Sequence, residues 1–413
     1  MSGPAQTPQA LAGLRVLDLT RILAGPWATQ IFADLGAEVI KIERPEGGDD
    51  TRSWGPPDLH DSAGENRGAA YFHAANRGKK SIAVDIGAPE GQALVRDLAR
   101  HCDVVVENFK CGGLARYGLD YEGLRAVRPD IVYCSITGFG QTGPYADRAG
   151  YDFLIQAMGG LMSITGQPEG APGAEPMKVG VALTDILTGL YAVIGILAAL
   201  RHRDATGEGQ HIDLALLDVQ VATLANQALN YLATGRSPGR LGNAHPNIVP
   251  YQAFAARDGH IILAIGNDRQ FGRFCEVAGR PELAADPRYA TNPARVQNRE
   301  TLVPELQEIL RQRDMDDWIA RLGEAGVPVG PINDIARVFD DPQVIAREMR
   351  TRPVTESGAL VQGVGSPLKL SATPPMAGRA APRLGGDSTE VLAGLLGLDD
   401  ARIAQLRASG IVA

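Results

Sequence analysis

Strand-like and helix-like segments alternate through the first 138 residues, and this alternation constrains the fold more than any other feature of the chain. The apolar, strand-like segments are residues 14–20, 37–43, 81–86, 103–109 and 130–138. Helical periodicity appears between them at residues 26–36, 91–101 and 121–127. Apolar strands separated by amphipathic helices indicate βαβ units. The sequence therefore predicts an α/β fold built on a parallel, doubly wound sheet.

Ligands of such sheets bind outside the carboxyl ends of the strands. Arg44 follows the second strand, where Rossmann enzymes keep their ribose-reading residue, and a guanidinium binds phosphate bidentately. Further basic residues lie near other strand ends or turns, namely Lys79, Lys80, Lys110 and Arg116. Together they predict a cradle for an anionic ligand; the alternative is that each is a solvated surface charge.

The pattern changes after the first half, and a chain of 413 residues exceeds the usual size of one hydrophobic core. A Gly/Pro-rich segment at 234–250 precedes a strand pair with a turn at Asp258 and Gly259, and helix-like segments follow to about Leu322. We therefore expect two domains. The expected boundaries are 1–216 for the large domain, completed by 370–413, then a linker at 217–240, a small α+β domain at 241–341 and a returning linker at 342–369.

Asp185 is the only charged residue in the apolar stretch 179–200, VGVALTDILTGLYAVIGILAAL. An ionised carboxylate in apolar surroundings is costly unless something stabilises it or uses it. Thr184 and the apolar run that follows predict a helix starting close to the aspartate, whose N-terminus would help to keep the carboxylate charged. Such a group is suited to covalent nucleophilic catalysis. The structural alternatives are a helix N-cap and a buried salt bridge.

The same stretch is long enough to cross a bilayer. Gly180, Asp185 and Gly189 interrupt it, and the chain has a mean hydropathy of -0.09. We therefore expect a buried core helix and no membrane partner. The first twenty residues lack the basic start and apolar run of a signal peptide, which predicts a cytoplasmic protein.

Charge and metal-ligand spacing restrict the possible partners. A net charge of -8 leaves no basic stripe for a nucleic acid backbone, so nucleic acid is not expected as a partner. The four cysteines show no CxxC or Cys/His spacing and the histidines are scattered, so no metal site is predicted.

The segment GFGQTG (138–143) matches the dinucleotide-binding pattern GxGxxG. That pattern should open directly into a helix in the first βα unit, whereas Pro144 and polar residues follow a late strand here. A plain glycine-rich turn is the preferred interpretation, and a NAD(P)-binding dehydrogenase is kept as an alternative function.

Several segments together resemble the class III CoA-transferases, a group that includes formyl-CoA transferase and the carnitine and bile-acid CoA-transferases. The matching segments are 11–45, NRGKKSIAVDI (76–86), DVVVENF (103–109), GYDFLIQAMGG (150–160), 181–200, VPVGPINDI (327–335) and GSPLKLSATP (365–374). They keep the family's order and spacing from about Leu11 to the C-terminus.

The resemblance implies a large Rossmann-like domain to which the C-terminal segment returns, and a small domain joined by two linkers. It also implies two chains interlocked as a homodimer. Asp185 falls on the family's nucleophile. The CoA-binding positions of the family fall on Ile22, Ala24, Arg44, Lys79, Asn108, Phe109 and Arg116. The positions near the acyl group fall on Leu23, Trp54, Tyr151, Gly266 and Asn267.

Two departures from the formyl-CoA enzymes narrow the expected substrate. Those enzymes carry a glutamine where this chain has Leu23, and a glycine run where it has only Gly266. The segments GNAHPNIVPYQAF and GNDRQF resemble transferases that use succinyl-CoA with dicarboxylic acids such as glutarate. The resemblance thus implies CoA transfer from an acyl-CoA to a carboxylate through an aspartyl anhydride and an aspartyl-CoA thioester, with no permanently bound cofactor.

An α-methylacyl-CoA racemase is the alternative within the same fold. That reaction needs a general base beside the aspartate, commonly a histidine in the GYDF region. This chain has Tyr151 there and no histidine between His101 and His202, which disfavours the racemase.

Overall fold

The structure is a computed structural model that describes residues 9–376 and 378–413. Residues 1–8, part of the stretch without a signal-peptide pattern, lie outside the described residues. The chain divides into two compact units. The large unit contains the chain up to Leu161, Val179–Ala228 and Pro342–Ala413, and the small unit contains Met162–Lys178 and Leu229–Asp341.

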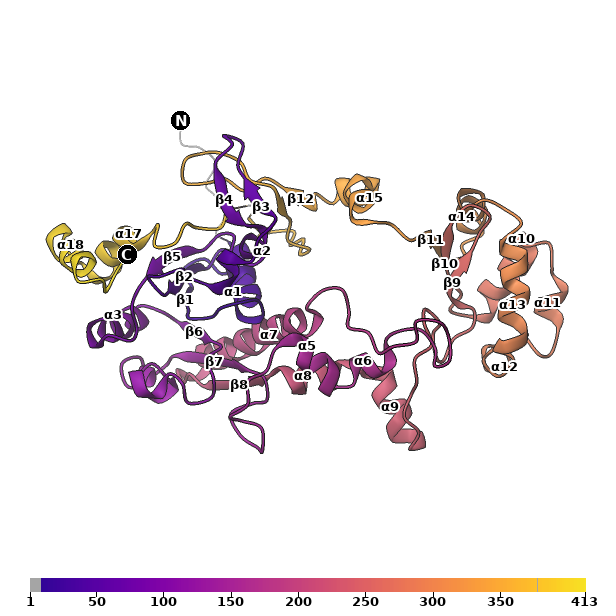
Figure 1. The fold of residues 1–413 in the computed structure, drawn as a ribbon, viewed down its shortest axis with the longest axis horizontal. Coiled ribbons are helices and arrows are strands. Elements are labelled where there is room, and N and C mark those ends of the chain that lie inside the picture. The colour runs from indigo at the N-terminus through magenta and orange to yellow at the C-terminus, as the bar shows by residue number, and fades with distance from the viewer. Residues whose placement is uncertain (1–8, 377) are drawn as a thin grey trace. The chain divides into compact units, whose positions relative to one another are not determined.

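A six-stranded sheet with parallel pairing forms the centre of the large unit (Figure 1). In spatial order its strands are β5 (Lys80–Ala83), β2 (Glu38–Glu43), β1 (Arg15–Asp18), β6 (Val104–Glu107), β7 (Val132–Thr137) and β8 (His211–Ala215). Counted along the chain, this order is 3-2-1-4-5-6, that of a doubly wound nucleotide-binding sheet. The predicted α/β fold is confirmed.

Helices cover both faces of this sheet. Because side chains alternate along a strand, Val16 packs into the core on one face and Leu17 into the core on the other. The first core contains α1 (Ala24–Asp34) and α7 (Leu183–Thr206). The second contains α3 (Pro89–Arg100), α17 (Ser388–Leu396) and α18 (Asp400–Ala408). Burial on both faces explains why the strands read as continuous apolar runs.

The remaining elements of the large unit are short. They are η1 (Asp50–Ser53), β3 (Asp58–His60), β4 (Asn66–Ala69), α2 (Ala70–Ala74), η2 (Ala115–Tyr117), α4 (Tyr121–Arg125), α5 (Asp152–Met158), α8 (Leu216–Thr223), α16 (Pro342–Ala346), β12 (Arg350–Thr351) and β13 (Gly363–Val364). The C-terminal segment returns to the edge strand β5, where Asp387 accepts a hydrogen bond from the Ser81 amide at 2.9 Å.

The small unit is α+β. Its antiparallel sheet has the order β11 (Val329–Pro331), β10 (His260–Ala264), β9 (Tyr251–Ala255), and the turn at Asp258 and Gly259 joins β9 to β10 as predicted. Its helices are α10 (Asp268–Val277), α11 (Glu282–Ala285), α12 (Asn292–Gln297), α13 (Arg299–Leu310), α14 (Met315–Glu324) and α15 (Ile335–Asp340). Two more helices, α6 (Leu161–Ile164) and α9 (Ala225–Thr234), cross the unit boundaries.

The boundaries of the units differ from the expected domains in two places. Residues 342–369, expected as a linker, cluster with the large unit, and residues 162–178, expected in the large domain, cluster with the small one. Helices α8 and α9 also occupy most of the expected linker 217–240. The expected boundaries rested on changes of pattern along the sequence and on the family resemblance, whereas tertiary contacts decide which core a segment joins.

Among the described residues, α7 is the helix long and apolar enough to cross a bilayer, with a mean hydropathy of 2.0 in its most apolar window. Half of that window is buried inside the protein. Ala192 and Ile196 pack with Ala28 and Phe32 of α1 in the core beneath the sheet. This packing matches the core helix expected from the sequence.

Candidate active site

The site lies where the strand order of the sheet reverses, between β1 and β6. Residues 19–23, the first βα loop, connect β1 to α1, and the chain turns at Asn108 after β6. The Asn108 side chain joins these segments: its Oδ1 accepts from the Arg21 amide at 2.9 Å, and its Nδ2 donates to the Arg21 carbonyl at 2.7 Å. In doubly wound sheets this crevice is the ligand site.

Glu107 fixes the turn that follows β6. Its carboxylate accepts from the Phe109 amide at 2.7 Å, and burial raises the pKa of Glu107 to about 7. The turn after β6 therefore fixes the position of Asn108, whose side chain contacts the first βα loop.

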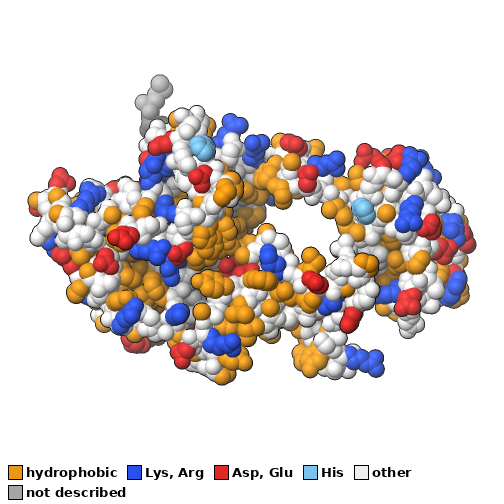
Figure 2. All heavy atoms as spheres, in the orientation of Figure 1, with side chains coloured by type: hydrophobic (Ala, Val, Ile, Leu, Met, Phe, Trp, Pro, Cys, Tyr) orange, Lys and Arg blue, Asp and Glu red, His pale blue; other side chains and the backbone are white. Residues whose placement is uncertain are grey.

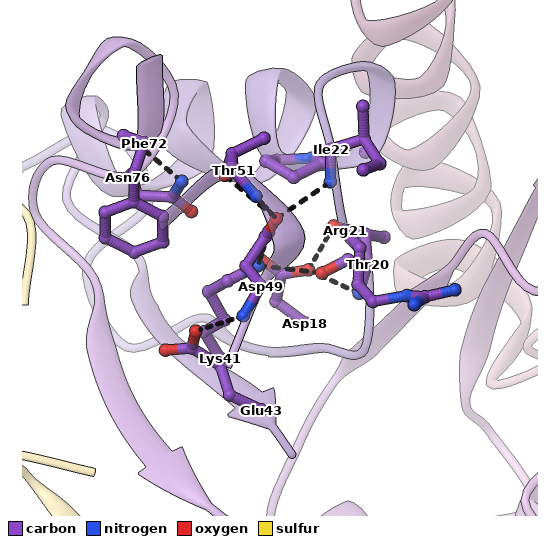
Figure 3. Close-up of polar contacts among 12 residues, drawn as sticks. Asp18, Thr20, Arg21, Ile22, Lys41, Glu43, Asp49, Thr51, Phe72 and Asn76 are labelled. Atoms are coloured by element: carbon purple, nitrogen blue, oxygen red, sulfur yellow. Dashed lines mark hydrogen bonds and ion pairs between the residues drawn. The ribbon is translucent and has the colours of Figure 1, made fainter. Parts of the chain in front are cut away.

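Ile22, in the first βα loop, has a φ of 72°, in the left-handed region. For a non-glycine residue this conformation costs roughly 1–2 kcal/mol, and a branched side chain makes it rarer still. The Ile22 amide donates to the Asp49 carboxylate at 3.2 Å (Figure 3). Immediately after it, α1 begins, and Leu23 at the N-cap position supplies no side-chain cap. Backbone strain at a ligand crevice indicates a functional constraint.

Asp185 occupies the first turn of α7, which begins at Leu183, so the predicted helix start is confirmed. Its side chain is buried, with 9% exposed. Within the part of the chain that the structure describes, no ion pair to Asp185 is found. The cap of the helix comes from another residue: Asp152 Oδ1 accepts from the amides of Thr184 and Asp185 at 2.8 and 3.2 Å. Both structural alternatives for Asp185, N-cap and salt bridge, are therefore wrong.

The electrostatics of Asp185 differ from those expected at a helix N-terminus. Burial, and after it the negative charge of Asp152, raises the pKa of Asp185 to about 7. The helix start does not keep the carboxylate fully charged, because the apolar surroundings and a like charge outweigh it. Near neutral pH the group is poised between its acid and its nucleophilic carboxylate form.

A glycine brings α7 against the first turn of α1. A Cβ on Gly189 would lie 2.8 Å from the Ala24 carbonyl oxygen and 3.1 Å from a Trp27 ring carbon. Only a residue without a side chain permits this approach. One turn earlier on the same helix, Asp185 consequently lies beside the start of α1.

Two cavities meet at the first βα loop. The first, of about 160 Å³, is lined by Asp185 together with Ile22, Leu23, Ala24, Asn108, Phe109 and Tyr151. The second, of about 300 Å³, is lined by Arg44 and Arg116 among others. Arg21 and Phe109 line both. Lys110 lines the first cavity as well, so the structure gathers ten of the predicted site residues around two adjoining cavities.

Lys79 does not belong to this group, which corrects the prediction from the sequence. The side chain is fully buried, and its Nζ contacts Asp18 at 3.0 Å, the Pro26 carbonyl at 3.0 Å and Asn76 at 2.9 Å. Burial lowers the pKa of Lys79 to about 8. A buried ammonium with three partners cannot reach a phosphate, so Lys79 has a structural role.

Four other predicted residues lie outside both cavities; one of them, Lys80, pairs with Glu38 and Glu390, each at 2.8 Å. Trp54 is 44% exposed and packs edge-on against Tyr71, with ring centroids 5.1 Å apart. Gly266 and Asn267 belong to the small unit, where the Gly266 amide donates to Gln270 at 2.8 Å and Asn267 caps α10. That amide is therefore already used within its own unit, and the place of Gly266 near the acyl group stays a prediction.

Sequence reasoning missed several residues of the site. Arg148 lines the cavity of Asp185, and its guanidinium lies 4.6 Å from the Tyr145 ring and 5.7 Å from the Phe139 ring. Asp152 was also missed, although it follows Tyr151 directly in the GYDF motif. An acidic residue at that position of the motif is the signal that could have pointed to it. Tyr71 packs against Trp54, and burial, then the charges of Asp185 and Asp152, raise its pKa.

The glycine-rich segment after β7 is a turn and not a dinucleotide fingerprint. Gly140 has a φ of 90°, its amide donates to Thr137 at 2.9 Å, and the chain reaches its next helix only at Asp152. The described residues contain no cluster of three His, Cys, Asp or Glu side chains arranged to hold a metal ion.

Comparisons with known proteins agree with this geometry. The family model for CoA-transferase family III matches residues 11–388. The chain is 55% identical to succinate–glutarate CoA-transferase from Agrobacterium fabrum, over 93% of this chain and 95% of that protein. It is 43% identical to human succinyl-CoA:glutarate CoA-transferase, over 97% and 90%.

A solved structure shows the same fold. The crystal structure of a CAIB/BAIF family protein from Brucella suis aligns with a TM-score of 0.82 and 54% identity, covering 94% of this chain and all of that one. The chain belongs to CoA-transferase family III.

Proposed function

We propose that this protein transfers CoA from succinyl-CoA to a dicarboxylic acid such as glutarate, with Asp185 as covalent nucleophile. The observation that carries the proposal is a buried carboxylate, free of ion pairs in the described chain, in the wall of a cavity at the sheet's ligand crevice. Two relatives named as succinate or succinyl-CoA:glutarate CoA-transferases support the choice of substrates.

The reaction needs only the Asp185 carboxylate and the substrates. A carboxylate oxygen attacks the thioester carbon, the C–S bond breaks, and a mixed anhydride and CoA thiolate form. The thiolate then attacks the aspartyl carbonyl and releases the donor acid, leaving an aspartyl-CoA thioester. The acceptor carboxylate displaces the thiolate from this thioester, and the thiolate attacks the acceptor's side of the new anhydride. Asp185 is regenerated, with no net uptake or release of protons.

The surroundings of Asp185 suit this chemistry. A carboxylate with a raised pKa is more basic, and hence more nucleophilic, than a solvated one. Leu23, Ala24 and Leu216 line the same cavity and keep the anhydride away from water, which would hydrolyse it.

The second cavity is proposed to hold the phosphates of CoA. Arg44 and Arg116 line it, and the pantetheine arm would pass Arg21 and Phe109 to reach Asp185. Asp50 pairs with both Arg21 and Arg44 at 3.2 and 2.6 Å, which orients these guanidinium groups while leaving other N–H donors for an anion.

Arg148 is proposed to bind the second carboxylate of a dicarboxylic substrate. It lines the cavity of Asp185 and is stacked on aromatic rings, and it forms no ion pair with any acid in the described parts of the chain. A planar guanidinium fixed in this way matches a carboxylate bidentately. No histidine lines either cavity among the described residues, so the base expected of a racemase is missing there.

The proposal also includes a homodimer, a cytoplasmic location and acyl-CoA thioesters as substrates without a permanently bound cofactor. Neither nucleic acid nor a membrane is a proposed partner.

The decisive experiment traps the intermediate. Incubation with succinyl-CoA alone should leave a covalent adduct on the Asp185 peptide, and hydroxylamine should remove it. Asp185→Asn keeps the size but lacks the nucleophilic carboxylate, so transfer to glutarate should fall by several orders of magnitude while CoA still binds. Mass spectrometry locates the adduct; an adduct on another residue, or near-normal transfer by the Asn variant, contradicts the mechanism.

A further inference from the structure

The first βα loop is held by side chains at five successive backbone groups. The Thr20 amide donates to Asp18 at 2.9 Å, and the Thr20 carbonyl accepts from Lys41 at 2.7 Å. Asn108 satisfies the amide and the carbonyl of Arg21, and Asp49 accepts from the Ile22 amide. Regular secondary structure supplies none of these contacts, so the loop depends on them for its conformation.

Asp49 is the centre of this arrangement. Its Oδ1 also accepts from the Thr51 amide at 3.0 Å, and its own amide donates to Glu43 at 2.9 Å. Its carboxylate pairs with Lys41 at 2.9 Å, with both side chains fully buried. In Figure 3 the Asp49 carboxylate points at the Ile22 amide.

Lys41 ties this carboxylate to the other end of the loop, because the same ammonium contacts both Thr20 and Asp49. Burial disfavours its charge, but the carboxylates of Asp18, Asp49 and Glu43 outweigh burial and raise the pKa of Lys41. The ammonium therefore stays charged at physiological pH and keeps its contacts with Thr20 and Asp49. We call the contacts of Lys41 and Asp49 with residues 20–22 the clamp.

The clamp acts at a strained position. Ile22 holds a φ of 72° although an L-residue with a branched side chain avoids that region. Ile22 to Ala24 line the cavity of Asp185, Thr20 lines the second cavity, and Arg21 lines both. A loop that relaxed to an unstrained conformation would move the walls of both cavities together.

We propose that Asp49, held by Lys41, is a positioning residue for acyl-CoA: it keeps the first βα loop in its strained conformation and so aligns the two cavities. Both side chains also line the second cavity, but they are fully buried and paired with each other, so their role is assigned through the loop and not through contact with CoA. The inference rests on the proposed function, since it assumes that acyl-CoA occupies both cavities.

The test is a kinetic comparison of Asp49→Ala with the wild-type protein, using succinyl-CoA and glutarate. We expect the KM for succinyl-CoA to rise about ten- to hundredfold, because small misplacements at a binding site have effects of that size. The KM for glutarate should rise less than the KM for succinyl-CoA, since Arg148, proposed to bind the second carboxylate of glutarate, belongs to another segment of the chain. Asp49→Asn keeps an oxygen acceptor for the Ile22 amide, so its KM for succinyl-CoA should lie between those of the wild-type protein and Asp49→Ala.

A double-mutant cycle separates positioning from a loss of general stability. Glycine adopts a φ of 72° without strain, so Asp49→Ala should raise the KM much less in an Ile22→Gly background than in the Ile22 protein. Asp34→Asn is the matched control, because it weakens another buried ion pair, with Arg77, that lines neither cavity; its KM should stay at the wild-type value.

If Asp49→Ala folds poorly, Asp49→Asn combined with Lys41→Met removes both charges and leaves no unpaired ion in the core. This pair should raise the KM for succinyl-CoA as well. An unchanged KM in the Asp49 variants, an equal effect in both Ile22 backgrounds, or an equal rise in Asp34→Asn would each overturn the positioning role. A wild-type protein that moves no CoA would instead refute the proposed function.

Discussion

At the residue scale, the reactivity of Asp185 is set by its neighbours. Burial is the larger influence that raises its pKa to about 7, and the charge of Asp152 is the second. In the proposed mechanism the ionised form is the nucleophile, so activity is expected to rise as pH rises through that value.

The expected dependence of activity on pH follows from the raised pKa of Asp185. The kcat/KM for succinyl-CoA should fall about tenfold per pH unit below pH 7 and level off above it. Asp152→Asn removes the like charge but keeps an amide oxygen for the Thr184 amide, so the acid limb should move to lower pH. Asp185 stays buried in this variant, so the midpoint of the acid limb should stay above the pKa of a solvated aspartate. Profiles of both proteins test this, with the exposed Asp97→Asn as control; a limb that stays in place in Asp152→Asn contradicts the assignment.

Arg148 should decide between dicarboxylic and monocarboxylic acceptors. Arg148→Gln removes a charge-assisted contact worth about 1.5–3 kcal/mol, so the KM for glutarate should rise roughly ten- to hundredfold. The KM for butyrate, which has no second carboxylate, should change little. Arg125→Gln is the matched control, because Arg125 also stacks on a tyrosine but lines neither cavity. Equal losses with glutarate and butyrate would assign Arg148 to CoA instead.

At the element scale, the contact between α1 and α7 places Asp185, the proposed nucleophile. A Cβ at Gly189 would meet the Ala24 carbonyl at 2.8 Å, and backbone cannot yield as a flexible side chain can. Gly189→Ala should therefore push α7 from α1, lower the free energy of unfolding by about 1–3 kcal/mol and reduce kcat.

Gly195→Ala is the matched control on the same helix. Its Cβ would lie 3.5 Å from Ile212, an ordinary contact, so the change should leave kcat unaltered and raise helix stability by up to about 1 kcal/mol. Denaturant unfolding and initial rates measure both effects. Equal behaviour of the two variants would show that the close approach at Gly189 does not matter.

At the scale of the whole molecule, exposed apolar surface favours a dimer. Hydrophobic side chains gather in exposed patches on the large unit (Figure 2). The large exposed ones on α5, α7 and α8 are Phe153, Leu154, Met158, Leu190, Tyr191, Ile194 and Val221. Patches of this kind mark protein interfaces.

The proposed interlocked dimer should not dissociate on dilution, because linked chains cannot separate without unfolding. Analytical ultracentrifugation at nanomolar concentration should show a single species of twice the chain mass, with denaturant as the control that releases monomers. A monomer under native conditions would contradict the proposal.

The sequence by itself determined the sheet, the helix that carries Asp185 and most of the loops around it. Alternating apolar runs and periodic helices are local signals, and the chain order of βα units largely dictates which strand ends meet. The family resemblance, and not a local pattern, predicted residues 22–24, Asn108 and Phe109, and they line one cavity with Asp185.

Only the tertiary structure decided which charged groups are free to act. Lys79 and Arg44 look alike as basic residues near strand ends, yet one is buried with three partners and the other lines a cavity. The pKa of Asp185 and the clamp of Asp49 on Ile22 likewise depend on contacts between distant segments. Burial and electrostatics are properties of the packed molecule, so no local pattern of residues could have shown them.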